Sequence, residues 1–272
     1  MAGDAVSRPE TAGSSKSVLT STQKTLALLE VMATQPRPAG VSELARLVGA
    51  SRGTVHKQLT TLVASEWVEQ NRDGRYGLSL QAARVGNAAL RHAGLGDRIQ
   101  RVLEDLVEAT GETASVAVLE GATGLIAQRA ESGQVLHANI RVGTQMPLNS
   151  GGASNLVLLA FALTERQRCA LRERGVDMPS EAAIRDVHAE GLATSVDEFV
   201  EGVAAVSIPF RSDLEFKTMA LTIAGPVARL HVASATRALH EAREQINALA
   251  GVPRSADQQD VRLDAGSGDV HA

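Results

Sequence analysis

The chain has one cysteine, Cys169, among 272 residues, which excludes an internal disulfide bond. Aromatic residues make up 2% of the chain, which argues against an aromatic cage around a ligand. No run approaches the roughly 18 apolar residues that a membrane-spanning helix requires. The first 16 residues contain acids and no apolar stretch, unlike a secretory signal. We therefore expect a cytoplasmic protein without membrane contact, in which Cys169 is a packing or surface residue.

Motifs for catalysis and metal binding are also missing. The sequence has no P-loop, no dinucleotide fingerprint, no HExxH and no nucleophile elbow. None of its seven histidines stands at metal-ligand spacing from another histidine or the cysteine. His137 falls in an expected strand and is interpreted as a core or pocket residue. We predict no catalytic residue, no cofactor and no metal.

Charge is distributed unevenly. Residues 16–95 contain ten basic and five acidic residues, whereas the remainder of the chain is acidic and brings the total to −4. A basic front segment is typical of a module that meets nucleic acid, and its binding should be sensitive to salt.

The basic segment contains the pattern of two short helices joined by a tight turn. Ser42 is the expected cap of the first helix, and Gly49 ends it in a left-handed conformation. Ser51 is the expected cap of the second helix. The expected buried stripes are Leu44, Leu47 and Val48 in the first helix, and Val55, Leu59, Leu62 and Val63 in the second.

The other face of the second helix has no acid. It is small, polar or cationic, as a helix that approaches a polyanion would be. A plain amphipathic pair in a bundle explains this pair of helices equally well. The next segment favours DNA binding, because residues 66–70 and 75–78 predict a hairpin around a turn at 71–74, with Arg72 and Arg75 near its tip.

A helix at 22–33, apolar at Leu26, Leu29 and Ala33, precedes the pair and completes the order of a winged helix-turn-helix. We expect DNA contacts from the exposed face of the second helix and from the hairpin: Ser51, Arg52, Gly53, Thr54, His56, Lys57, Thr60, Arg72 and Arg75.

Five segments are expected along the chain: disordered residues 1–20, the winged domain at 21–79, a linker helix at 80–95, a second domain at 96–251 and a disordered tail at 252–272. In the second domain, strands are expected at 114–119, 125–130, 135–142, 203–210 and 218–224. Helices are expected at 97–110, 164–174, 180–190 and 234–249. These elements predict an α+β fold with one central sheet. A Gly-rich turn at 149–154 opens into an apolar helix, which makes a candidate anion site.

From about residue 18 to 250 the chain resembles the IclR family of transcriptional regulators. In the front the resemblance rests on residues 41–45, 51–59 and 76–78. In the rear it rests on residues 143–148, 191–193, Glu198, 202–209 and 221–226, which are more specific.

The resemblance implies a winged helix-turn-helix domain, a linker helix and a GAF/PAS-like effector-binding domain. Such proteins are homodimers, often homotetramers, that control catabolic operons in response to small, frequently carboxylated or aromatic metabolites. Carried over to this sequence, the effector site comprises Gly152, Ala153, Ser195, Val203, Ala205, Thr222 and Ala224. The candidate anion site at the Gly-rich turn adds Ser154 and Asn155 as ligand-binding residues.

Three positions depart from the family pattern. Asn155 stands where a lysine-type residue is frequent, Ser195 where well-known members have an acid, and Ala205 where they have a cysteine. The expected partners are therefore a DNA operator and an effector whose identity is open. Two alternatives remain: an enzyme that turns over a small metabolite in its second domain, and a constitutive DNA-binding protein with a vestigial site.

Overall fold

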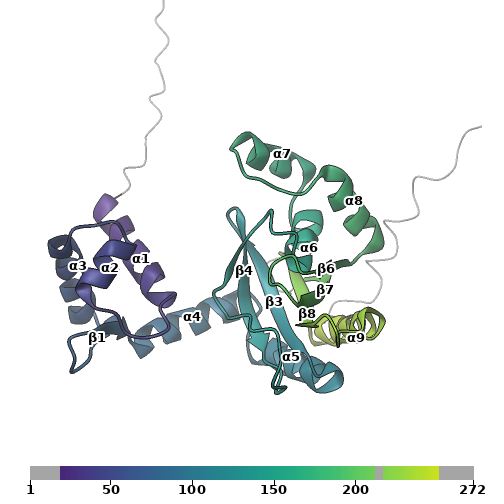
Figure 1. Ribbon diagram of the computed structural model, residues 1–272, viewed down its shortest axis with the longest axis horizontal. Coiled ribbons are helices and arrows are strands. Elements are labelled where there is room, and N and C mark those ends of the chain that lie inside the picture. Colours follow the sequence, from purple (N-terminus) through teal and green to yellow (C-terminus); the bar gives the residue numbers. More distant parts are fainter. Residues whose placement is uncertain (1–18, 212–216, 251–272) are drawn as a thin grey trace, which may run out of the picture. The chain divides into compact units, whose positions relative to one another are not determined.

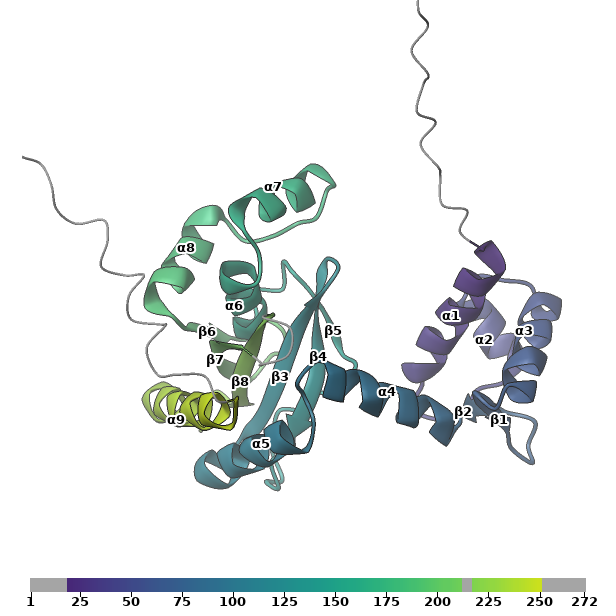
Figure 2. The same cartoon turned by 180° about the vertical axis from the view of Figure 1, so that it is seen from behind.

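A computed structural model describes residues 19–211 and 217–250 (Figures 1 and 2). The chain forms two compact units that divide between Arg84 and Val85, inside the helix α4 (Leu80–His92). The segments expected to be disordered, 1–20 and 252–272, lie outside the described residues except for Leu19 and Thr20, and α1 begins at Thr20.

The first unit is a winged helix-turn-helix, as predicted. Its elements are α1 (Thr20–Ala33), α2 (Val41–Leu47), α3 (Arg52–Ala64), β1 (Val68–Gln70) and β2 (Tyr76–Leu78). The two strands pair antiparallel around the turn, and Ala39 adds a bridge to Tyr76. The hairpin is therefore attached to the segment between α1 and α2 as well as to α3.

The core of the first unit is built on Leu28, Leu44, Val55 and Leu59, which are fully buried. Val55, Leu59 and Leu62 confirm most of the predicted stripe of α3. Val63 is 39% exposed, because it lies about 80° around the helix from Val55.

Two other predicted faces are wrong in part, although Leu44 is buried and Leu29 and Val48 pack against the core as predicted. In α1 the buried residues are Leu28 and Met32, whereas Leu26 is exposed. In α2, Ala45 is buried in place of the exposed Leu47. Both helices carry apolar residues on more than one side, so contact with the neighbouring elements decides which side is buried.

The helix caps follow the sequence with one exception. Ser51 accepts a hydrogen bond from the backbone N–H of Thr54 at 3.2 Å and caps α3. Gly49 and Gly74 have the positive φ values that their turns require. Ser42 does not cap α2, because the helix begins at Val41 and Gly40 is its N-cap.

The second unit contains a six-stranded antiparallel sheet in the order β5-β4-β3-β8-β7-β6. The strands are β3 (Thr113–Glu120), β4 (Thr123–Ala130), β5 (Gln145–Pro147), β6 (Ala193–Val196), β7 (Val203–Arg211) and β8 (Thr218–Pro226). The expected α+β class is confirmed.

Helices cover both faces of this sheet (Figures 1 and 2). One face carries α5 (Asp97–Thr110) and α9 (Val232–Ala250), and the other carries α6 (Ala153–Phe161). The face under α5 and α9 is filled by large side chains, among them Val206, Ile208, Phe210, Met219, Leu221 and Ile223. Most of the apolar burial in this unit therefore lies on one side of the sheet.

Beyond α6 lie α7 (Glu165–Glu173) and α8 (Glu181–Glu190). Arg168, which is 8% exposed, forms an ion pair with Glu181 at 3.1 Å and donates to the Leu159 and Leu163 carbonyls. Hydrogen bonds from Arg168 and then Arg172 lower the pKa of the Glu181 carboxyl below its usual value. This network joins the start of α8 to α6 and α7.

The strand predicted at 135–142 is absent. Residues 135–142 form an irregular segment, and Gly143, with a φ of +85°, turns the chain back into β5, which takes the edge beside β4. His137 therefore lies in a loop, paired with Glu131 at 3.0 Å. The short strands β5 and β6 were not predicted.

Replacing Leu59 by alanine should destabilise the first unit by about 2–5 kcal/mol, because it opens a cavity in a fully buried site. Denaturant unfolding followed by the fluorescence of Trp67, the single tryptophan, measures this change. The control Val63→Ala on the same helix should change stability by only about 0.5 kcal/mol. An equal loss of unfolding free energy in the two variants would contradict the orientation of α3.

Candidate DNA and effector sites

The exposed surface of α3 carries the predicted DNA contacts. Ser51, Arg52, Gly53, Thr54, His56, Lys57 and Thr60 are all exposed, while Val55 and Leu59 face the core. No acidic residue occurs between Ser51 and Ser65. The side of α3 that points away from the core is therefore cationic or neutral along its whole length.

The hydroxyl groups on this surface are held by local hydrogen bonds. Thr60 and Thr61 donate to backbone carbonyls one turn earlier, and the Ser51 and Thr54 hydroxyls lie 2.9 Å apart. The side chains of Arg52 and Lys57 have no hydrogen-bond or ion-pair partner within the described part of the chain. These two cations are therefore free to meet an external anion.

The two arginines of the hairpin differ in their contacts. The Asn71 carboxamide oxygen accepts from the N–H groups of Asp73 and Arg75 and fixes the turn. Arg72 is exposed and has no partner among residues 19–211 and 217–250. Arg75 donates to the Pro38 carbonyl at 3.3 Å and pairs with Glu43 at 3.5 Å, which the sequence did not indicate. Arg72 is thus the free cation of the wing.

The predicted effector residues meet where α6 begins. Gly152 is the N-cap of α6, and the N–H of Ala153 donates to the Ser195 hydroxyl at 3.1 Å. Ser195 lies opposite Ala205, and Ala205 opposite Ala224, on adjacent strands. Five of the nine residues, from positions far apart in sequence, are therefore neighbours. Val203 lies on the same face of β7 as Ala205.

Asn155 and Ser154 turn toward β5 instead. The fully buried Asn155 side chain donates to the Met146 and Pro147 carbonyls and to the Ser150 hydroxyl. The Ser154 hydroxyl contacts the Met146 sulfur at 3.8 Å. Asn155 therefore braces the turn that precedes α6.

The sheet surface beneath α6 is called the α6-facing floor. Antiparallel register places Thr113, Ser115, Ala193, Ser195, Val203, Ala205, Ser207, Ala220, Thr222 and Ala224 on it. Almost all are Ala, Ser or Thr, in contrast to the large residues on the opposite face. Ser115, Thr222 and Ser207 form a row, with the Thr222 and Ser207 hydroxyls 2.8 Å apart. Only Thr222 of this row was predicted, since the register that assembles it is not visible in the sequence.

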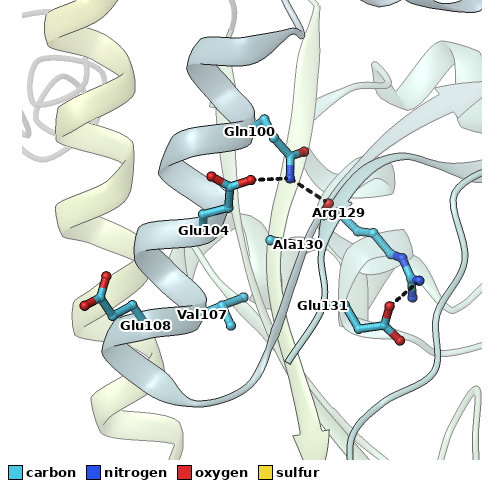
Figure 3. A pocket seen from close by; sticks show the side chains of 7 residues that line it. All are labelled: Gln100, Glu104, Val107, Glu108, Arg129, Ala130 and Glu131. Atoms are coloured by element: carbon cyan, nitrogen blue, oxygen red, sulfur yellow. Dashed lines mark hydrogen bonds and ion pairs between the residues drawn. The ribbon is translucent and has the colours of Figure 1, made fainter. Parts of the chain in front are cut away.

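A surface cavity of about 470 Å³ lies on the α5 side of the sheet (Figure 3). Its lining includes Glu104 and Glu108 of α5 and Glu131 at the end of β4. Gln100 donates to Glu104, and Arg129 pairs with Glu131 at 2.7 Å. The cavity contains none of the predicted effector residues, and its polar groups bond largely to one another.

The described residues contain no cluster of histidine, cysteine or acidic side chains that could hold a metal ion. None of the helices in the described ranges is long and apolar enough to cross a membrane.

Comparison with known proteins matches both units to one family. A family model described as "Bacterial transcriptional regulator IclR C-terminal" matches residues 87–250, and "IclR helix-turn-helix domain" matches residues 21–72. The chain belongs to the IclR family. Its members are DNA-binding transcriptional regulators rather than enzymes, so the resemblance seen in the sequence is confirmed and the enzyme alternative has no support.

Relatives of the IclR family match most of the chain. The glycerol operon regulatory protein of Streptomyces coelicolor is 31% identical over 223 residues, which cover 77% of this chain and 86% of the relative. The crystal structure of Pseudomonas aeruginosa HmgR is 26% identical with a TM-score of 0.68, covering 86% and 98% of the two chains.

A Microbacterium hydrocarbonoxydans IclR homologue complexed with 4-hydroxybenzoate has a TM-score of 0.72, covering 86% of this chain and 100% of that one. At 20% identity this match shows a shared fold alone. The fold of both units is therefore that of the family.

Asn155→Ala should lower the stability of the second unit by about 1–3 kcal/mol, because the Met146 and Pro147 carbonyls and the Ser150 hydroxyl lose the buried amide group that donates to them. Unfolding followed by circular dichroism tests this. Ser154→Ala, one residue away, removes only a long contact to sulfur and should cost less. Equal stability of the two variants would contradict a bracing role for Asn155.

Proposed function

We propose that this IclR-family protein binds a palindromic DNA operator as a cytoplasmic homodimer, or as a homotetramer, and that a small-molecule effector modulates the binding. The observation that carries the proposal is the exposed, acid-free surface of α3 with its free cations Arg52 and Lys57. In a helix-turn-helix protein the second helix enters the major groove and its first residues reach base edges.

Each expected DNA contact then has a proposed role. Arg52, in the first turn of α3, reads a base, and Lys57 and His56 contact bases or phosphates. Gly53 permits close approach of DNA to the α3 backbone. It carries no side chain, and no protein atom fills the space where a Cβ would lie. Thr54 also faces bases or phosphates, Ser51 and Thr60 lie near the DNA backbone, and Arg72 holds a flanking phosphate. Arg75 positions the hairpin through Pro38 and Glu43.

The effector is proposed to dock between the start of α6 and the α6-facing floor, where Gly152, Ala153, Ser195, Val203, Ala205, Thr222 and Ala224 gather. To regulate, it must bind two arrangements of the protein with different affinity. The exposed helix α4, in which none of the residues is buried, is the proposed link and dimer contact. The glycerol operon relative supports a catabolic operon as the target.

Arg52→Ala should weaken binding to the protein's own upstream DNA by about 1–3 kcal/mol and reduce its preference over a scrambled duplex. A guanidinium that pairs with a base edge contributes to specificity as well as affinity. Fluorescence anisotropy with both duplexes measures the two constants. Arg98→Ala on α5 is the matched control. Equal weakening on both duplexes would assign Arg52 to a phosphate, and no retention of any duplex by wild type would refute the proposed function.

Arg72→Ala should weaken binding to all duplexes alike and reduce the slope of log K against log salt by about 1, because one phosphate contact is lost. Titrations at several salt concentrations give the slope. Arg75→Ala, on the same hairpin, should change the slope less, since its guanidinium already has internal partners. A larger change in slope for Arg75→Ala than for Arg72→Ala would show that Arg75 is the phosphate contact.

A further inference from the structure

The deep part of the candidate effector site is covered. Thr222, Ala224 and Ala153 are at most 3% exposed, although all three are expected to contact the effector. The surface cavity on the α5 side of the sheet reaches none of them. A ligand can therefore reach these residues only if a segment that covers the α6-facing floor moves.

Helix α6 is a fixed cover. Its residues Val157, Leu158 and Leu159 are fully buried and belong to two apolar clusters of the second unit. Lifting α6 from the sheet would expose all three side chains to water, which is strongly unfavourable. The segment that moves must be attached less firmly than this helix.

The chain between β4 and β5 is a second cover, here called the strap (residues 131–142). It contains no helix or strand, and its large apolar residues Val135, Leu136 and Val142 are exposed. Ile140 packs against the apolar cluster under α6. A segment that buries so little apolar surface opens more readily than an element of the core.

The first half of the strap is tied to the end of the sheet at which β3 begins. The Ser132 N–H donates to the hydroxyl of Thr113, a residue of the floor, at 3.3 Å. The Arg229 guanidinium donates to the Leu136 carbonyl at 2.8 Å. Arg229 also donates to the buried carboxylate of Glu112 at 2.8 Å, which fixes its position. Hydrogen bonds, rather than apolar contacts, therefore hold this half.

Arg129 of β4 holds the second half. It lies opposite Ser115 in the pairing of β3 with β4, so its side chain is on the same side of the sheet as the row of hydroxyl groups. Its guanidinium donates to the Ile140 carbonyl and pairs with Glu131 at 2.7 Å (Figure 3). Glu131 in turn contacts the His137 ring at 3.0 Å. One cation at the edge of the floor thus binds both ends of the strap.

We propose that the strap is the gate of the effector site, and that Arg129 and Arg229 are the positioning residues that hold it closed. This inference rests on the proposed function, because the gate serves the effector site proposed above. Opening the strap breaks a few hydrogen bonds whose groups then bond to water, so its net cost is modest. Val135 and Leu136 are exposed already, so opening adds little apolar surface. Ser115 and the floor behind it then become accessible from the β4 edge.

The turn between β6 and β7 is the alternative gate, since Phe199 and Val200 are also exposed. Its bonds are internal to the turn. The Asp197 N–H donates to the Val203 carbonyl at 3.0 Å, and the Asp197 carboxylate accepts from the Gly202 N–H at 2.6 Å. These bonds make the turn a continuation of the two strands, whereas the strap is held by side chains from other elements.

Thiol labelling of the full chain tests the gate. In a Cys169→Ser background, Ser115→Cys places one thiol on the floor beside Arg129, and the neutral reagent dithiodipyridine measures its accessibility. Arg129→Met should raise the labelling rate about tenfold, the effect of one lost charged hydrogen bond on the population of the open strap. Arg129→Lys keeps a cation that can donate and should restore most of the slow rate. Glu131→Ala, at an exposed position, should also accelerate labelling.

The matched control is Val116→Cys, one residue along β3, whose side chain lies in the cluster under α5. Arg129→Met should not change the labelling rate of this thiol, because the strap does not cover that face of the sheet. Asp197→Gly removes the side-chain bond of the β6–β7 turn and tests the alternative gate. It should leave the labelling rate of Ser115→Cys unchanged.

Three outcomes would overturn the inference: an unchanged rate at Ser115→Cys in both strap variants, equal acceleration at the thiols of Ser115→Cys and Val116→Cys, or acceleration by Asp197→Gly alone. DNA retention by the wild-type protein is measured in parallel. Retention without an effect of Arg129→Met refutes only the gate, whereas failure of the wild type to retain DNA refutes the proposed function.

Discussion

The antiparallel pairing of β3, β8, β7 and β6 is the constraint on which the second unit depends. It sets Ser115 opposite Thr222, Thr222 opposite Ser207, and Ser195 opposite Ala205. A shift of one residue in any pair would turn the small side chains toward α5 and the large ones toward α6. Both the main core and the candidate effector site would then be lost together. The stability of the unit and its recognition surface are therefore set by one register.

The first unit meets a different requirement. Its core must hold α3 firmly while leaving one whole side of that helix without internal partners. Val55, Leu59 and Leu62 provide the attachment, and Ser51 secures the first turn. The hydroxyls of Thr60 and Thr61 donate to backbone carbonyls of α3 itself. The side chains of Arg52 and Lys57 make no such bonds. Ala39 and Arg75 tie the hairpin back to the segment before α2, which leaves Arg72 at the tip.

Local signals in the sequence were sufficient for much of the fold. Gly49, Ser51 and Gly74 act within a few residues, α5 begins and ends where its pattern indicates, and α4 begins at Leu80 as expected. The predictions that were wrong depend on contacts between residues far apart in the sequence. Leu26 and Leu47 are as apolar as their buried neighbours, and only packing distinguishes them. The alternation at 135–142 resembles a strand, but the edge that it would need is taken by β5. Ser115 and Ser207 entered the candidate site through strand pairing, which no local pattern specifies.

The contact between Asn155 and Gly124 links two parts of the chain. The carboxamide oxygen of Asn155 presses against Gly124, where the Cβ of any larger residue would collide with it. The same amide group holds the end of β5 through two carbonyls. A side chain at position 124 therefore requires a change at position 155. Gly124, the second residue of β4, and Asn155, thirty-one positions later, should therefore be replaced together if either is replaced.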